Sequence, residues 1–290
     1  MKQDSRYLVI DAGSGKVGTG PLPQYMSKMQ SGGSIHRRLN ALGGQQDCIF
    51  LVTHNHQDHF CLFRYLGNFF NRIRAPIWIE KLAKSFWSSF SKTLEVVGCV
   101  PRDYLGEDVS ISCLVPPKNA KEVHENNLIV FVKYGKVLFI LPGDADGDYL
   151  NLNAGAFMAK LSEESNGCTH CCIVLPHHGS NSNGTLALTL AAHRVLLENE
   201  CGEVIFIISS NPMENDRLPR PAVLPLLPHM PQVTQHNYRH SNGRLSITSP
   251  VFITCEATDG AGYLVTTDGD NLHLFDGTTP IPDRLLYPVQ

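Results

Sequence analysis

The chain has 290 residues, of which 42% are hydrophobic and 18% charged, and its formal net charge is −3. This composition is typical of a globular protein with a substantial core, and the near-neutral charge excludes an overall basic surface for polyanions. The nine cysteines, an odd number scattered along the chain, do not indicate a disulfide framework and favour a reducing compartment. The chain has neither a signal-peptide pattern nor the roughly 20 apolar residues of a membrane span, so we expect a cytoplasmic protein without a membrane partner.

Short β-rich runs alternate with stretches of helical apolar spacing, which predicts the α/β class. In the first half, strands are expected at 7–15, 48–53 and 75–80, and helices at 34–42, 59–73 and 81–98. In the second half, we expect a hairpin about "YGK" at 127–144, helices at 154–165 and 185–200, strands at 171–180 and 203–210, and a hairpin within 252–275. Two successive α/β halves, each with helices on one face of its sheet, fit a four-layer αββα sandwich.

Three histidines and an aspartate follow the second expected strand within six positions: His54, His56, Asp58 and His59. Residues two apart in an extended segment point the same way, so His54 and His56 can bind one metal ion. Asp58 and His59 can then face a second ion. A solvated polar turn is the simpler alternative, but four potential ligands in one turn favour a metal site.

Further potential ligands stand at two other strand ends. Asp144 follows the apolar run that ends in "LPGD", and His177 and His178 follow the run that ends in "LPHHGS". Loops at strand ends converge on one edge of an α/β sheet, where active sites are commonly built. The motif "CTHCC" at 168–172 is half of a possible zinc site, but without a partner pair buried strand cysteines are favoured.

The motifs "LVIDAG", "THNHQDH", "LPGDA" and "PHHGS", in this order, resemble the metallo-β-lactamase superfamily of metallo-hydrolases. "PHHGS" and the later "TDGAGYLV" resemble the metallo-hydrolase domain of the DNA-internalisation competence protein. The resemblance implies a metallo-β-lactamase-like hydrolase domain over 1–276 with a long loop at 211–250, followed by a tail at 277–290. Family members usually carry a strand hairpin before "IDAG". This chain lacks it, so we expect that either the sequence is a fragment or another element, such as a partner protein, completes that part of the fold.

The resemblance also implies a site with two divalent metal ions, Zn or Mn, and a water nucleophile. Its metal ligands would be His54, His56, Asp58, His59, Asp144 as the bridging carboxylate, and either His177 or His178. One more ligand is expected at His124, with Glu125 and Asn126 as alternatives. Asp58, His59 and Asp144 would take part in catalysis, with Asp58 able to accept a proton from the bridging water.

Two further roles follow from the same resemblance. Asp11 would orient a ligand histidine, although a carboxylate just beyond a strand can also cap a turn. Arg220 stands where competence-type domains have a histidine before a proline, and an arginine can hold a phosphate bidentately. Together with Ser180 and Asn181 it would bind substrate.

A metal site of this kind predicts hydrolysis by metal-activated water, and the resemblance to competence-type domains implies a phosphodiester of nucleic acid as the first substrate class. A single strand is favoured over a duplex, because the sequence shows no long basic stripe and no recognition helix. One alternative is hydrolysis of a small ester, thioester or lactone. Another is a non-catalytic or regulatory module of a larger assembly.

Overall fold

The computed structural model describes residues 6–11, 47–54, 56, 59, 72–76, 94–97, 100–116, 127–180, 185–209, 251–253 and 263–276. The chain divides into two compact units. Unit 1 comprises residues 1–107 and 281–290, and unit 2 comprises residues 108–280. The single hydrolase domain over 1–276 stays a prediction, because one functional domain can contain two compact halves.

Unit 1 contains a parallel sheet of four strands in the order β1-β2-β3-β4. The strands are β1 (Arg6–Ile10), β2 (Asp47–Leu51), β3 (Arg72–Pro76) and β4 (Leu94–Val97). The strands expected at 7–15 and 48–53 are therefore confirmed over residues 7–10 and 48–51, and residues 12–15 lie outside the described part of the chain. The helix expected at 34–42 lies outside the described residues.

Two helix predictions in unit 1 were wrong at their ends. Residues 72 and 73, expected at the end of a helix, begin β3, and residues 94–97, expected in the next helix, form β4. β4 pairs in parallel with β3 over four residues from Leu94 to Val97. The segment "LEVV" carries two β-branched valines, which favour strands, and a short apolar run cannot be assigned from periodicity alone.

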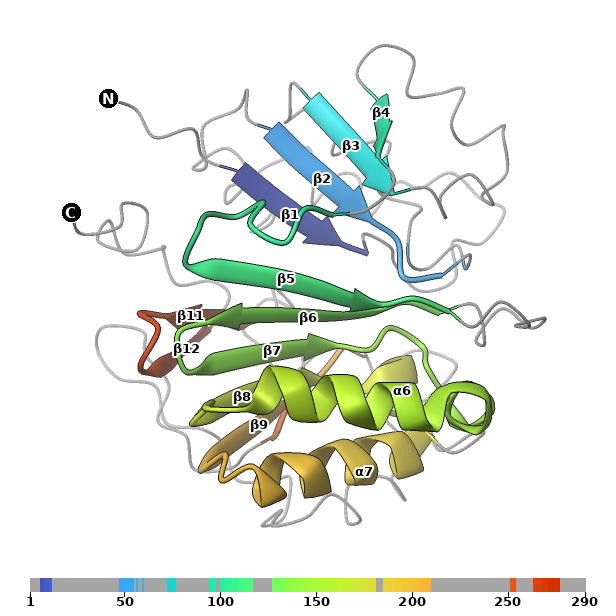
Figure 1. Ribbon diagram of the computed structural model, residues 1–290, viewed down its shortest axis with the longest axis vertical. Coiled ribbons are helices and arrows are strands. Elements are labelled where there is room, and N and C mark those ends of the chain that lie inside the picture. Colours follow the sequence, from blue (N-terminus) through green and yellow to red (C-terminus); the bar gives the residue numbers. More distant parts are fainter. Residues whose placement is uncertain are drawn as a thin grey trace. The chain divides into compact units, whose positions relative to one another are not determined.

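Unit 2 is built on a six-stranded mixed sheet in the order β10-β9-β8-β7-β6-β5 (Figure 1). Its strands are β5 (Val109–Leu114), β6 (Ile129–Tyr134), β7 (Val137–Leu141), β8 (His170–Val174), β9 (Glu203–Ile208) and β10 (Val251–Ile253). β5, β6 and β7 pair antiparallel, whereas β7 to β10 run parallel. The expected hairpin at 127–144 is confirmed as β6 and β7, while β5 was not anticipated.

Two helices cover one face of this sheet: α6 (Gly147–Ser165) and α7 (Thr185–Glu198) (Figure 1). Both belong to β-α-β crossovers that advance along the sheet in the same direction, which places both helices on the same face. α6 begins earlier than the sequence predicted, because Asp146 caps it. Asp146 Oδ1 accepts hydrogen bonds from the backbone N–H groups of Asp148 and Tyr149 at 3.0 and 3.2 Å.

The core of unit 2 follows the alternation of side chains along its strands. Leu138 and Ile140 of β7, with Phe206 and Ile208 of β9, pack on the side of α6 and α7. The residues between them face the other way, where Val137, Cys172 and Ile205 pack against a second, two-stranded sheet. This sheet is the hairpin of β11 (Tyr263–Thr267) and β12 (Leu272–Asp276), which contributes Leu272 and Leu274.

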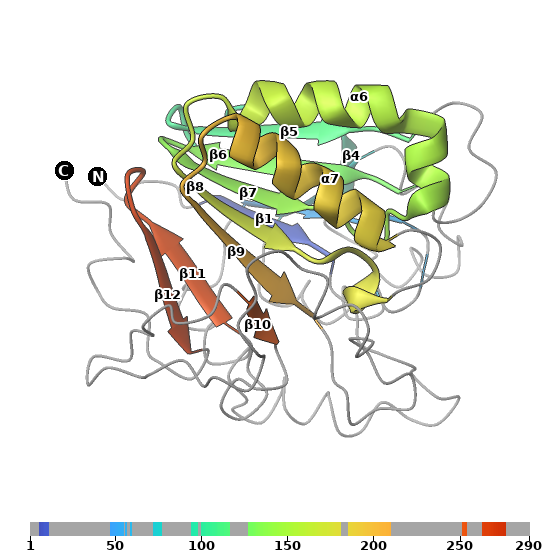
Figure 2. The same cartoon turned by 90° about the horizontal axis from the view of Figure 1, so that it is seen from below.

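Unit 2 is therefore layered, with helices on one side of the sheet and the β11–β12 hairpin on the other (Figure 2). The α/β sandwich class expected from the sequence is confirmed, as is the hairpin predicted within 252–275. Within the described part of the chain, both helices are too short or too polar to span a bilayer. The cytoplasmic location stays a prediction.

Candidate functional site

The expected site residues follow the carboxyl ends of parallel strands in each unit. In unit 1, Asp11 follows β1, and the segment from Thr53 to His59 follows β2, which pairs in parallel with β1. In unit 2, Asp144 follows β7, and His177 lies three residues beyond the end of β8, which is again a parallel neighbour. Neighbouring parallel strands end at the same sheet edge, which is why segments distant in sequence meet there.

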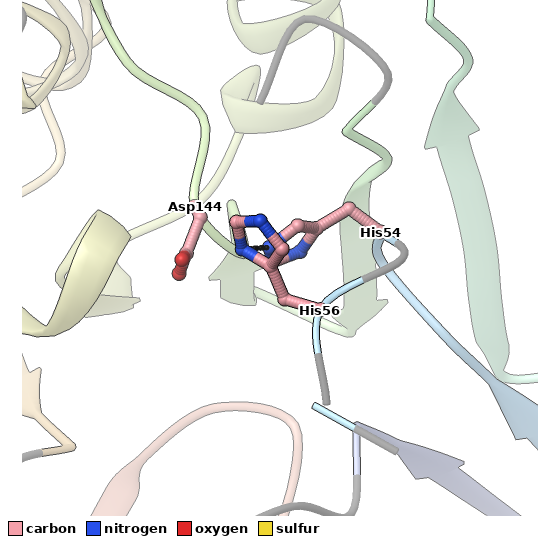
Figure 3. Close-up of side chains that lie close together, drawn as sticks. All are labelled: His54, His56 and Asp144. Carbon is pink, nitrogen blue, oxygen red and sulfur yellow. Dashed lines mark hydrogen bonds between the residues drawn. The ribbon is translucent and has the colours of Figure 1, made fainter. Parts of the chain in front are cut away.

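The three described histidines of unit 1 form a compact cluster. The ring centroid of His54 lies 4.6 Å from that of His56 and 4.2 Å from that of His59, both in edge-on arrangements. His54 Nε2 and His56 Nδ1 lie 2.9 Å apart, within hydrogen-bonding distance (Figure 3). His54 and His59 are buried, with 4% and 5% of their surface exposed. Imidazoles whose nitrogens converge in this way are a typical metal-ligand set.

Asp11 anchors this cluster through its side-chain carboxylate. Oδ1 accepts from the Thr53 backbone N–H at 2.8 Å, and Oδ2 accepts from the Thr53 hydroxyl and from His59 Nδ1, each at 2.7 Å. A hydrogen on Nδ1 leaves the lone pair of His59 on Nε2, the nitrogen that could ligate a metal. This contact is the one expected if Asp11 orients a ligand histidine.

Thr53 is part of the same network, although the sequence analysis did not single it out. Its hydroxyl lies 3.2 Å from His54 Nδ1 and 3.4 Å from His59 Nδ1. Asp11 itself has a φ of 51°, in the left-handed region, and its backbone N–H donates to the Leu51 carbonyl at 2.9 Å. A non-glycine residue in this conformation is held by its surroundings and is common at functional sites.

In unit 2, Asp144 is buried between the two histidines of "PHHGS". Its Oδ2 lies 3.9 Å from His177 Nε2, and its Oδ1 lies 3.9 Å from His178 Nε2. Both separations are too long for a hydrogen bond between these atoms. Each carboxylate oxygen thus faces the nitrogen of a different imidazole at a distance that suits ligands sharing an ion. The turn that carries Asp144 after β7 is drawn in Figure 3.

The two histidines stand in an unusual backbone turn, the short 3₁₀ helix η2 (Pro176–Gly179). His177 and His178 have φ angles of 50° and 53°, and Gly179 follows at 75°. Left-handed conformation costs roughly 1–2 kcal/mol per non-glycine residue. Backbone hydrogen bonds hold it, from His177 N–H to the Gly143 carbonyl at 3.0 Å and from Ser180 N–H to the His177 carbonyl at 2.8 Å.

His178 has a second contact that distinguishes it from His177. Its Nδ1 donates to the Ser209 carbonyl at 2.8 Å, just beyond the end of β9. A ring held through Nδ1–H presents the lone pair on Nε2, which is the atom that faces Asp144. The sequence could not reveal this contact, because Ser209 contributes only its backbone.

Several expected site residues lie outside the described residues, and their roles stay predictions. They are Asp58, His124, Glu125, Asn126, Asn181 and Arg220, together with the loop 211–250. Ser180, proposed to bind substrate, is described and is buried.

The cysteines of "CTHCC" do not form a second metal site of three close ligands in the described structure. Cys168, Cys171 and Cys172 are buried free thiols, as is Cys201 before β9. Burial raises the pKa of the Cys172 thiol to about 12 and that of Cys201 to about 11. The thiols therefore stay protonated at neutral pH in the metal-free protein. The interpretation of "CTHCC" as buried strand cysteines is confirmed for Cys171 and Cys172 in β8, while Cys168 is buried just before that strand.

Comparisons with known proteins give remote structural similarity. No family model and no curated protein sequence matches the chain. A diphosphatase of the PhnP family is 12% identical, with a TM-score of 0.39, covering 69% of this chain and 67% of that one. Zn(2+)-bound PqqB from Methylobacterium extorquens is 13% identical at a TM-score of 0.39, covering 69% and 71%. The metallo-β-lactamase fold protein YhfI from Bacillus subtilis is 12% identical with a TM-score of 0.35, covering 71% of this chain and 86% of that one. Similarity at this level says nothing of the chemistry of this chain.

Proposed function

We propose that this chain is a hydrolase that uses two divalent metal ions, Zn or Mn, to activate water. The observation that carries the proposal is the histidine cluster of His54, His56 and His59, in which His54 and His59 are buried and His59 donates to Asp11 at 2.7 Å. Imidazole nitrogens are common ligands of Zn and Mn, so three imidazoles packed together after a strand end suit a metal site.

The donor set fits the ions proposed. Imidazole nitrogens with a buried carboxylate suit Zn and Mn, and thiolates are absent among the described candidate ligands. Within unit 2, His178 is the better candidate of the histidine pair, because the Ser209 carbonyl fixes its Nδ1 hydrogen. Asp58 and His124 complete the proposed ligands. That the histidine cluster and Asp144 supply one centre is a prediction from the order of the motifs.

When bound, a pair of such ions supplies a hydroxide at neutral pH and stabilises the attacking and leaving oxygens of a displacement. The residues of this chain have separate tasks. Asp11 holds the His59 ring in one orientation through Nδ1, and Ser209 does the same for His178. Asp58, His59 and Asp144 are the proposed catalytic residues, with Asp58 accepting the proton of the attacking water.

We further propose a phosphodiester of single-stranded nucleic acid as the substrate, on the resemblance to competence-type domains. With a net charge of −3, the chain must attract phosphates through local cations, and Arg220 is the proposed contact, aided by Ser180 and Asn181. The same metal chemistry would hydrolyse a small ester, thioester or lactone. A partner protein that completes the first part of the fold remains part of the proposal.

The test combines metal analysis of the purified protein with hydrolysis assays in Zn, Mn and Mg. The substrates are single-stranded and double-stranded oligonucleotides, a phosphodiester model compound, and a panel of small esters, thioesters and lactones. We expect bound Zn or Mn and cleavage of single-stranded DNA or RNA. Metal binding with turnover of small esters alone would refute the nuclease assignment, and failure to bind Zn or Mn would refute the metal-hydrolase assignment itself.

The role of Arg220 can be tested separately. Arg220→Ala should raise the nucleic-acid concentration needed for half-maximal cleavage. It should also reduce the slope of log binding constant against log salt concentration by the amount expected for about one phosphate contact. The metal content should stay unchanged. Arg194→Ala is the matched control, because Arg194 on α7 is exposed and pairs only with Glu198 in the described contacts. An equal salt slope in the Arg220 variant and wild type would remove Arg220 from the substrate site.

A further inference from the structure

Asn127 is a fully buried polar residue directly before β6. Its Nδ2 donates to the carbonyl of Pro142 at 2.6 Å and to that of Leu128 at 3.1 Å. Its Oδ1 accepts from the backbone N–H of Asp144 at 3.0 Å. The carboxamide thus uses both of its N–H groups and its oxygen on backbone atoms, and two of these three contacts fall on the turn that follows β7.

This turn decides where the Asp144 carboxylate points. β7 ends at Leu141, so the sheet no longer provides a partner for the Asp144 N–H, and Asn127 provides it instead. The Pro142 carbonyl also accepts from Ala145 N–H at 3.2 Å, and Gly143 adopts a φ of 58°. A buried N–H without a partner is costly, so the turn keeps this geometry only while Asn127 satisfies it.

The same turn contacts the histidine segment of unit 2. The Gly143 carbonyl accepts from His177 N–H at 3.0 Å, which supports the left-handed backbone of η2. Asp144 in turn faces His177 and His178 through its two oxygens. A displacement of residues 142–145 would therefore move the carboxylate and loosen the histidine turn together.

We propose that Asn127 is a positioning residue: it holds Asp144, and through Gly143 also His177, in the arrangement needed to bind metal without touching the metal itself. The inference rests on the proposed function, since it explains why the turn that carries Asp144, a proposed metal ligand, is held in place. The inference goes beyond the proposed function because it names a residue that is not itself a proposed metal ligand. Groups that orient metal ligands commonly affect metal affinity by about 10- to 100-fold when removed.

The test compares Asn127→Leu and Asn127→Ala with wild type in the full chain. Leu is close to Asn in shape but makes no hydrogen bond, and Ala removes the contacts without adding bulk. The matched control is Asn199→Leu, because Asn199 also donates to two acceptors, the Ser162 carbonyl and Ser165 Oγ, at 3.1 and 2.6 Å. Those contacts join the ends of α6 and α7 and involve none of residues 142–145.

Affinity for Zn and Mn is measured by competition with a chromophoric chelator, after circular dichroism has shown that each variant is folded. We expect about 10- to 100-fold weaker metal binding in the Asn127 variants and unchanged binding in Asn199→Leu. Wild-type affinity in a folded Asn127 variant would overturn the proposal. So would failure of both Asn127 variants to fold while Asn199→Leu folds, since Asn127 would then be purely structural. Lack of metal binding by wild type would instead refute the proposed function.

Discussion

Replacing Asp11 by asparagine should weaken metal binding in unit 1 while leaving most of the fold intact. Asparagine keeps the shape of the side chain and tolerates the left-handed backbone at this position, where φ is 51°. Its oxygen can still accept from Thr53 N–H, as Oδ1 of Asp11 does at 2.8 Å. Its amide nitrogen, however, cannot accept the hydrogen that His59 Nδ1 donates to Oδ2.

The size of the effect follows from the contacts that are lost. Oδ2 accepts two hydrogen bonds of 2.7 Å, from His59 Nδ1 and from the Thr53 hydroxyl, and the hydroxyl can reverse to accept from the new amide. One hydrogen bond to a charged group is therefore lost, which is worth about 1.5–3 kcal/mol of unfolding free energy. The freed His59 ring should lower metal affinity about 10- to 100-fold.

Asp11→Ala should be more damaging to the fold than Asp11→Asn. It also removes the partner of the buried Thr53 N–H. In addition, it places alanine, which has a Cβ but no polar side chain, in the left-handed region, and this conformation costs roughly 1–2 kcal/mol of unfolding free energy. We expect a total loss of about 3–5 kcal/mol of unfolding free energy. The two variants thus separate the orientation of His59 from the integrity of the turn.

The assay measures metal affinity by chelator competition and stability by urea unfolding of the metal-free protein. Asp103→Asn is the control, since Asp103 lies in an exposed turn of the same unit. It should change neither quantity by more than a few tenths of a kcal/mol. If Asp11→Asn bound metal as tightly as wild type, Asp11 would not orient a metal ligand, and its contacts would be those of a turn cap alone.

Three further predictions concern unit 2. Phe131→Ala should cost about 3–5 kcal/mol of unfolding free energy, because Phe131 is fully buried in the core, and a loss under about 1 kcal/mol in urea unfolding would contradict that packing. Gly135→Ala should cost more than about 1 kcal/mol, since φ is +56° and a Cβ would collide with the Gly269 carbonyl; wild-type stability would exclude this contact. Stability should also fall between pH 9 and 11. Burial raises the pKa of Cys172 to about 12 and of Cys201 to about 11 from 9.0, so over this range the two thiols ionise more readily in the unfolded chain than in the folded protein. The doubly substituted Cys172→Ala, Cys201→Ala protein should lose less stability over this range, and an equal loss would contradict the thiols as its source.

The local sequence by itself determined the hairpin of β6 and β7 and the position of each candidate ligand at a strand end. The hairpin connection needs only two residues, Gly135 and Lys136, and the glycine accepts the positive φ that this turn requires. The ligand positions follow from apolar runs that stop at His54, Asp144 and His177. Both signals lie within a few residues, so no distant partner is needed to recognise them.

The tertiary structure alone decided that residues 94–97 form a strand, because their apolar pattern suits a helix as well as a strand and the pairing with β3 selects the strand. It also decided which groups hold the ligands. Asp11 reaches His59 across 48 positions, Asn127 reaches Asp144 across 17, and the Ser209 carbonyl reaches His178 across 31. Such contacts leave no pattern in the local sequence, since they exist only where the sheet brings the ends of neighbouring strands to one edge, parallel for β1 and β2 and antiparallel for β6 and β7. A backbone carbonyl, moreover, has no residue type to recognise.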